Sequence, residues 1–447
     1  MHEEAGGSRR RSAARAAGFL AAAAAAPAIG LLAAGAAPGG EDVMDAAAVS
    51  YVKLALAVGA HDPDYVDAYY GPPEWRQEAE RARRPLSALR GEAAGLAGRL
   101  EGMDPSGDGM EALRRTFLIK QLRSMAARVE MLGGRRMGFD EESEALYDAR
   151  APRIDEARLE QVLARLEELL PGKGPVHQRY HDWRSGFAIP PARLDDVFKT
   201  AVAACRERTA ARVALPEGES FIIEYVKDKP WSGYNWYQGG LRSLIQVNVS
   251  LPVFADRALD LACHEGYPGH HVYNMMLEHH LVKGRGWKEF TVYPLFSPQS
   301  LIAEGSANLG IEIAFPGSER EAFDREVVFP RAGLDPARVS EYARVQELSR
   351  ELDHAVNEAA RRYLDNAIDA SQAAAWLTRY ALMSPAAARQ RVTFIDRYRT
   401  YVINYNLGRD LVRDHVARRA GPGATAAETW RVFAELLSSP RLPSDLR

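Results

Sequence analysis

Long stretches with helical hydrophobic spacing, interrupted by one short β-rich segment, set the strongest limit on how this chain folds. In the segment 154–172, apolar residues recur every three or four positions before a Pro-Gly stop signal. This spacing is typical of a helix that buries one face in a core. Similar patterns predict helices over about 86–101 and 111–132. We therefore interpret residues 42–210 as an N-terminal helical region.

The residue composition changes near residue 220, where β-forming residues become frequent. The runs SFIIEYV (220–226) and SLIQVNVS (243–250) are rich in β-formers, and the segment between them is dense in Gly, Pro and aromatic residues. A helical stretch from about 255 to 281 follows. This order predicts a mainly α fold with a small β-sheet or hairpin beside that helix.

Two further helical stretches, 298–314 and 318–447, complete the chain. We interpret residues 211–447 as a second region, which carries the candidate functional residues. We also expect this region to form one continuous fold with residues 42–210.

The N-terminal segment has the order of a secretory signal. Four arginines between residues 9 and 15 precede an Ala-rich apolar run over 16–32. Because that run is short and contains a proline and a glycine, we expect a cleaved export signal over 1–37 rather than a stable membrane span. Cleavage is predicted near Ala36 or Ala37, which would send the protein to the periplasm or the cell exterior.

The charge balance narrows the class of partner. In 447 residues, 57 Lys and Arg face 60 Asp and Glu, so there is no electrostatic reason to expect nucleic acid or an anionic membrane. We expect a peptide or small amide substrate, and the oligomeric state is left open. The two cysteines, Cys205 and Cys263, exclude a disulfide scaffold, so stability must come from the core.

The stretch CHEGYPGHH (263–271) brings candidate metal ligands next to a glutamate. A catalytic zinc site needs three protein ligands at about 2.0–2.2 Å and one open position. A regular helix supplies two ligands from histidines at i and i+4. Here the residue four after His264 is Pro268, while His270 points away and His271 lies about 10 Å further along. A straight helix therefore cannot form the site.

A local bulge would solve this problem. Pro268 removes a backbone donor, and the flanking glycines tolerate the unusual dihedrals of a looped-out turn. If two residues bulge out, His270 takes the place of the i+4 ligand, with His271 in reserve. Glu265 could then act as the general base for a metal-activated water.

Glu304, in LIAEGSANLG, is the candidate third ligand. It lies on a helical stretch forty residues after His264, and Gly305 and Ala307 would allow close helix packing. An Asp or a third His would also serve. The histidines at 279 and 280 end the same predicted helix and are better explained by exposure or by the helix dipole.

HEGYPGHH followed by Glu-Gly-x-Ala resembles a bacterial family that carries a domain of unknown function with an HExxPGHH signature. That family is related in fold to zinc metallopeptidases whose third ligand is glutamate. The segments 234–248 and 397–412 also resemble it, so the likeness spans about 200–415. It implies a mostly helical, metallopeptidase-like (gluzincin-like) fold. The site that it implies consists of zinc held by His264, His270 and Glu304, with Glu265 as base.

A peptidase of this kind needs a donor for the oxyanion. Tyr405 and Arg409, four residues apart on one helical face, are the candidates. The run 243–250 could offer a sheet edge to an extended peptide. Aromatic residues that could line a substrate cleft are Tyr234, Trp236 and Tyr237.

Two other functions fit the same residues. A zinc hydrolase of non-peptide amides or esters would use identical chemistry. A non-catalytic exported protein could use the metal to hold two helices together. Glu265 argues against the second alternative, because a purely structural zinc site is usually closed by four ligands and needs no base.

Overall fold

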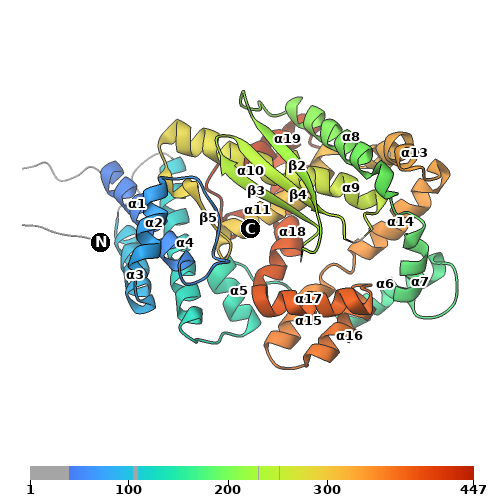
Figure 1. Cartoon of the computed structure of the whole chain (residues 1–447), viewed down its shortest axis with the longest axis horizontal. Coiled ribbons are helices and arrows are strands. Elements are labelled where there is room, and N and C mark those ends of the chain that lie inside the picture. The colour runs from blue at the N-terminus through green and yellow to red at the C-terminus, as the bar shows by residue number, and fades with distance from the viewer. Residues whose placement is uncertain (1–39, 104–108, 230, 251) are drawn as a thin grey trace, which may run out of the picture. The chain divides into compact units, whose positions relative to one another are not determined.

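The computed structural model has the mainly helical architecture, with a small β element, that the sequence predicts (Figure 1). It describes residues 40–103, 109–229, 231–250 and 252–447. The predicted export signal, 1–37, lies outside the described residues.

Helices make up most of the described chain. The α-helices are α1 (Gly40–Gly59), α2 (Pro73–Ala82), α3 (Leu86–Glu101), α4 (Gly109–Leu132), α5 (Phe139–Tyr147), α6 (Glu156–Leu169), α7 (Val176–Ser185), α8 (Pro191–Ala210), α9 (Ala255–Leu261), α10 (His270–Leu277), α11 (Pro298–Ala314), α12 (Ser318–Phe323), α13 (Phe329–Ala332), α14 (Val339–Arg350), α15 (Ala355–Leu364), α16 (Ala370–Tyr380), α17 (Pro385–Tyr398), α18 (Ile403–Ala420) and α19 (Ala426–Leu437). Single π-helical or 3-10 turns are η1 (Ala262–Gly266), η2 (Glu278–Lys283), η3 (Lys288–Thr291), η4 (Asp324–Val328), η5 (Pro336–Arg338), η6 (Arg399–Val402) and η7 (Pro443–Leu446).

The strands form two small sheets. In the first, β1 (Val66–Tyr69) pairs antiparallel with β5 (Val292–Pro294). The second contains β2 (Ser220–Val226), β3 (Gly233–Gly239) and β4 (Arg242–Asn248) in the order β2-β4-β3. Strand β4 is parallel to β2 and antiparallel to β3. Strand β3 lies in the Gly- and aromatic-rich segment that the sequence marks as a connection.

This order corrects one expectation. The run 243–250 was expected to offer a free edge, but β4 is the central strand and is paired on both sides. Leu244 of β4 is opposite Ile222 on one side and Trp236 on the other. The edges of this sheet belong to β2 and β3. Strand β4 is paired on both sides and leaves no edge for a peptide.

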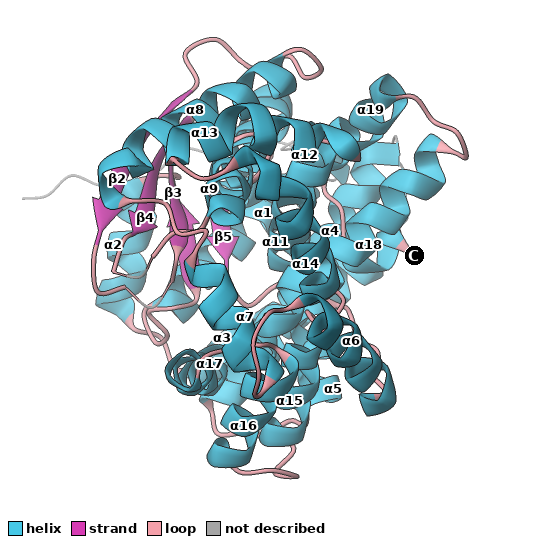
Figure 2. Cartoon of the chain, turned by 90° about the vertical axis from the view of Figure 1, so that its right-hand side faces the viewer, coloured by secondary structure: helices cyan, strands magenta, loops and turns pink. Residues whose placement is uncertain are grey.

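One face of the three-stranded sheet packs on the segment that carries the His-Glu motif, and Figure 2 shows the strands beside α9. Asn235, Tyr237 and Ser243 are buried on this face. Because side chains alternate along a strand, Ile222 and Trp236 lie on the opposite face, 69% and 42% exposed. The sheet thus presents polar side chains to the motif alongside buried apolar ones such as Ile245 and Val247.

The helices α11 and α18 cross at two glycines. A Cβ atom on Gly305 would overlap the carbonyl carbon of Gly408 and would lie 2.9 Å from its Cα. The two backbones are therefore in contact. This is the close helix packing that Gly305 was expected to allow. This crossing brings the start of α18 next to Glu304.

Residues 40–447 form one compact unit, which contains both the N-terminal helical region 42–210 and the segment 211–447. Its largest apolar core runs from Met44 of α1 to Leu446 near the C-terminus. Within the residues that the structure describes, no helix is both long and apolar enough to cross a membrane.

Candidate metal centre

The helix predicted over 255–281 is interrupted inside the motif. After α9, the chain makes the wide turn η1, in which the Tyr267 amide donates to the Ala262 carbonyl at 3.3 Å. Three non-helical residues follow, and the Gly269 amide donates to the Cys263 carbonyl at 2.9 Å. Pro268 has no N–H to continue the helical ladder, so a new helix, α10, begins at His270.

Gly269 has φ −79° and ψ −135°, a combination outside the helical and extended regions, as the expected role for unusual glycine dihedrals requires. Lack of space also requires a glycine at this position. A Cβ atom there would overlap the His264 carbonyl oxygen and lie 2.5 Å from that of Cys263. On α11, a Cβ atom at Gly310 would lie 3.3 Å from Pro268, so the turn is packed from both sides.

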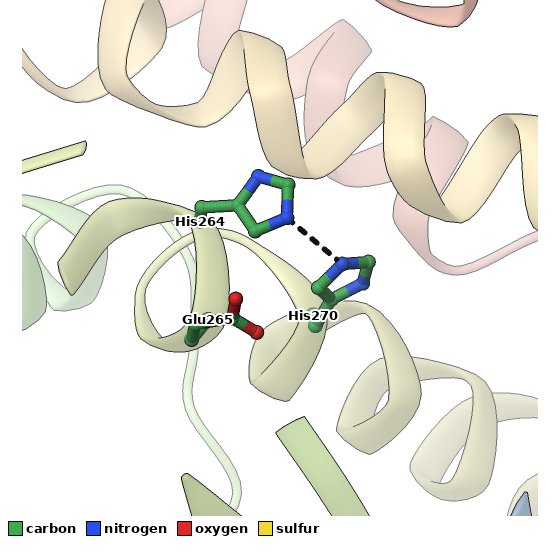
Figure 3. A group of neighbouring side chains, drawn as sticks. All are labelled: His264, Glu265 and His270. Carbon is green, nitrogen blue, oxygen red and sulfur yellow. Dashed lines mark hydrogen bonds between the residues drawn. The ribbon is translucent and has the colours of Figure 1, made fainter. Parts of the chain in front are cut away.

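The break brings His264 and His270 together beside Glu265 (Figure 3), and α11 adds Glu304. The Nε2 atoms of His264 and His270 are 3.1 Å apart. The Oε2 atom of Glu304 lies 3.6 Å from the first and 3.8 Å from the second. Ligand atoms at about 2.0–2.2 Å from a tetrahedral ion lie roughly 3.3–3.6 Å from one another. The triangle therefore has nearly the dimensions that a zinc ion needs.

Glu304 is held so that one oxygen stays free. Its Oε1 atom accepts a hydrogen bond from the Tyr401 hydroxyl at 2.8 Å. Its Oε2 atom is buried and has no hydrogen-bond partner among the described residues. Buried acceptors are rarely left unsatisfied in folded proteins. An orphaned carboxylate oxygen that faces two imidazole nitrogens fits a cation.

Burial and neighbouring charges together set the pKa values of the three candidate ligands. Burial, reinforced by the charge of His270, lowers the pKa of His264 to about 3. Burial also acts to lower the pKa of His270, but the carboxylate of Glu304 and those nearby outweigh it and raise the pKa to about 9. The pKa of Glu304 is lowered, because contacts with His270 and His264 outweigh its burial.

Glu265 lies beside the triangle and faces strand β3. One of its carboxylate oxygens belongs, with a nitrogen of each of His264 and His270, to a group whose atoms lie within 4.8 Å of one another. A Cβ atom on Gly233 would lie 2.7 Å from Oε1 of Glu265, and Asn235 donates to its backbone carbonyl at 2.7 Å. Burial raises the pKa of Glu265 to about 7.

His271, the reserve ligand, is directed elsewhere. Its Nε2 atom lies 3.0 Å from Oε2 of Glu219, and its Nδ1 atom lies 2.9 Å from the Ser243 hydroxyl. The Glu219 carboxylate also binds Arg206 and the Tyr267 hydroxyl. Because both ring nitrogens of His271 are engaged, His270 is the histidine that the structure brings to His264.

Of the two expected oxyanion donors, Tyr405 lies near the triangle and Arg409 does not. Tyr405 is part-buried, and desolvation together with the charge of Glu304 raises the pKa of its phenol, so it lies near the triangle. The Arg409 guanidinium instead binds Asp353 at 2.9 Å and Asp410 at 3.4 Å. Arg409 is therefore withdrawn as a site residue, because two aspartates outside the triangle neutralise its charge.

The aromatic residues expected to line a cleft lie on opposite faces of the sheet. Tyr237 is buried on the motif-facing side of the sheet and donates to Glu278 at 2.6 Å, so the expectation is wrong for it. Tyr234 and Trp236 lie on the other side, with ring centroids 4.5 Å apart. The Tyr234 hydroxyl donates to Asp67 of β1.

Sequence reasoning missed two groups near the triangle. Tyr401 is four residues before Tyr405, and that helical spacing is a weak signal that could have marked it. Asp67 feels the charges of His270 and Glu304, and burial raises its pKa to about 6. It is almost two hundred residues from the motif, so no local pattern connects them.

Comparison with known proteins adds information on the fold alone. No family model and no curated protein sequence matches this chain. Among solved structures, a protein from Colwellia psychrerythraea that is provisionally named a lipoprotein is similar, with a TM-score of 0.51 and 14% sequence identity. The aligned region covers 91% of this chain and 75% of the other.

Proposed function

We propose that the protein is an exported zinc-dependent metallopeptidase. The observation that carries the proposal is the triangle of His264, His270 and Glu304, with its orphaned carboxylate oxygen and the buried Glu265 beside it. Resemblance to the HExxPGHH family supports peptides as substrates, and the order of residues in 1–37 supports export.

His264, His270 and Glu304 would hold the ion. When bound, zinc would polarise the scissile carbonyl and lower the pKa of water. Glu265, buried beside the two histidines, suits the role of a base that accepts a proton and passes it to the leaving amine. Asn235 donates to the backbone carbonyl of Glu265 and so holds the main chain that carries this carboxylate.

Two tyrosines would assist. The Tyr405 hydroxyl is the candidate donor to the oxyanion that forms on the attacked carbonyl. Tyr401 does not touch the substrate in this scheme. It binds Oε1 of Glu304 and thereby leaves Oε2 directed at the two histidines, as an outer partner of a metal ligand does.

Elemental analysis of the purified protein and five variants tests the proposal. We expect about one zinc per chain in the parent, lost in His264→Ala, His270→Ala and Glu304→Ala. Zinc should remain in Glu265→Gln, which should fail to cleave peptides that the parent cleaves. His279→Ala, exposed at the end of the same helical segment, is the control and should behave as the parent.

Three results would contradict the proposal. Loss of zinc in Glu265→Gln would make Glu265 a fourth ligand and favour the structural alternative. Absence of metal from the parent after incubation with zinc would favour a non-catalytic protein. Zinc with cleavage of an ester or small amide, but of no peptide, would move the substrate class to the non-peptide alternative.

A further inference from the structure

Arg391 of α17 has no carboxylate or hydrogen-bond partner among the residues that the structure describes. It is part-buried, and its guanidinium carbon lies 5.1 Å from the centre of the Phe394 ring. Other buried arginines are neutralised: Arg114 binds Glu289 at 2.6 Å, and Arg128 binds Asp62 at 2.6 Å. Arg391 therefore differs from them in lacking a counter-charge.

Its surroundings lead to the metal triangle through aromatic rings. The Phe394 ring lies 6.4 Å from that of Tyr401, which holds Glu304, and the Tyr401 ring lies 5.6 Å from that of Tyr405. The Tyr405 phenol feels the charges of Arg391, Glu304 and Glu265. The Arg391 guanidinium is therefore close to Tyr405, the candidate oxyanion donor. The aromatic rings beside it include that of Tyr401, which binds the third ligand, Glu304.

The environment of Arg391 disfavours its charge. Burial lowers its pKa from the ordinary value, and the phenol of Tyr405 provides the opposing effect. A part-buried guanidinium without a partner has lost some of its hydration, and an arriving carboxylate recovers that cost through two parallel N–H···O bonds. Arginine suits this task better than lysine because its planar fork matches a carboxylate.

We propose that Arg391 binds a carboxylate of the substrate, so that the enzyme acts on acidic peptides or amides. The inference rests on the proposed hydrolase function and specifies its substrate class. The carboxylate could be the free C-terminus of a peptide or an acidic side chain close to the scissile bond, since both present the same two oxygens.

Calorimetric titration of the zinc-incubated Glu265→Gln protein tests this inference without turnover. The three probes are Ac-Ala-Phe-Ala with a free C-terminus, the same peptide as its C-terminal amide, and Ac-Ala-Phe-Glu amide. We expect at least one carboxylate-bearing probe to bind about tenfold or more tightly than the neutral amide. Preference for the first probe identifies the terminal carboxylate, and preference for the third identifies the side chain.

Adding Arg391→Met should remove the preference, so that the acidic and neutral probes bind within about twofold of one another. Arg389→Met is the matched control, because it removes the same charge from an exposed position of α17 and should keep the preference. Retention of the preference in Arg391→Met, or equal or absent binding of all probes to the Glu265→Gln protein, would overturn the inference. Zinc content and peptide cleavage by the parent protein are measured separately. A protein that binds zinc and cleaves peptides but shows no carboxylate preference would overturn this inference and leave the proposed function intact.

Discussion

Gly305 of α11 and Gly408 of α18 touch through their backbones at the point where the two helices cross. A Cβ atom on Gly408 would lie 2.8 Å from the Leu301 carbonyl oxygen, so neither position has room for a side chain. Glu304 immediately precedes one glycine, and Tyr405 lies three residues before the other. The crossing therefore sets the distance between the third ligand and the tyrosines that surround it.

Gly305→Ala should push the two helices apart. We expect a loss of about 1–3 kcal/mol in the free energy of unfolding, together with weaker zinc binding, because the added methyl group overlaps backbone atoms. Urea unfolding and zinc titration measure the two effects. Gly91→Ala is the control: it is exposed in α3 with open space around it, and it should be neutral or stabilising by roughly 0.5–1 kcal/mol.

Tyr401→Phe should weaken zinc binding while the fold is kept. The change removes the hydroxyl that binds Oε1 of Glu304, so the carboxylate loses its fixed orientation. Losing such an outer partner typically costs about 10–100-fold in metal affinity. Competition with a chelator measures the affinity. Tyr363→Phe, which removes an exposed hydroxyl bound to Asp396, should leave it unchanged, and equal affinities in the two variants would refute this role for Tyr401.

Glu219→Gln should destabilise the protein near neutral pH and matter less in acid. Burial acts to raise the pKa of Glu219, but hydrogen bonds from His271, Tyr267 and Arg206 outweigh it and lower the pKa to about 2. A carboxyl group whose pKa is depressed on folding stabilises the fold above its unfolded pKa. That contribution falls as the pH drops from near 4.5 towards 2.

The shift corresponds to roughly 3 kcal/mol at most. Urea unfolding of the parent and Glu219→Gln at pH 7, and again at pH 3, would show a smaller difference at the lower pH. Glu217→Gln, at an exposed neighbouring position, should cost little at either pH. A difference that stays constant between the two pH values would contradict the assignment.

Arg409→Gln should leave zinc content and peptide cleavage unchanged. The guanidinium neutralises Asp353 and Asp410, so its removal should lower stability, by about 1–3 kcal/mol for a part-buried pair left without its partner. Unfolding and cleavage assays on one preparation separate the two effects. A selective loss of turnover with normal stability would restore Arg409 as a site residue.

Local chemistry made part of this site predictable. Helical periodicity marks α3 and α11, and the missing N–H of Pro268 marks the break that brings His270 to His264. The choice between His270 and His271 was not predictable, because it depends on Glu219, which is 52 residues away from His271. Strand β3 was missed because its glycines and aromatic residues also suit a loop.

Asp67 also could not be predicted, because it is even further from the motif in the sequence than Glu219 is. It reaches the triangle because β1 contacts β3, and no sequence pattern records that contact. The spacing of Tyr401 from Tyr405 is only a weak signal in the sequence, and the Tyr401 hydroxyl acquires a role only when α11 and α18 cross. Residue chemistry predicted which groups can bind a metal, whereas long-range contacts decide which of them meet.

The hydrogen bond from Asn235 to Glu265 and the one between Ser243 and His271 mean that the motif is not a self-contained unit. A synthetic peptide of residues 255–281 would contain the histidines but none of the sheet that holds the turn open. Transplanting the motif into another helical protein would therefore require the strands to go with it. For the same reason, exchanges at Asn235 and Ser243 should be as consequential for the site as exchanges within the motif.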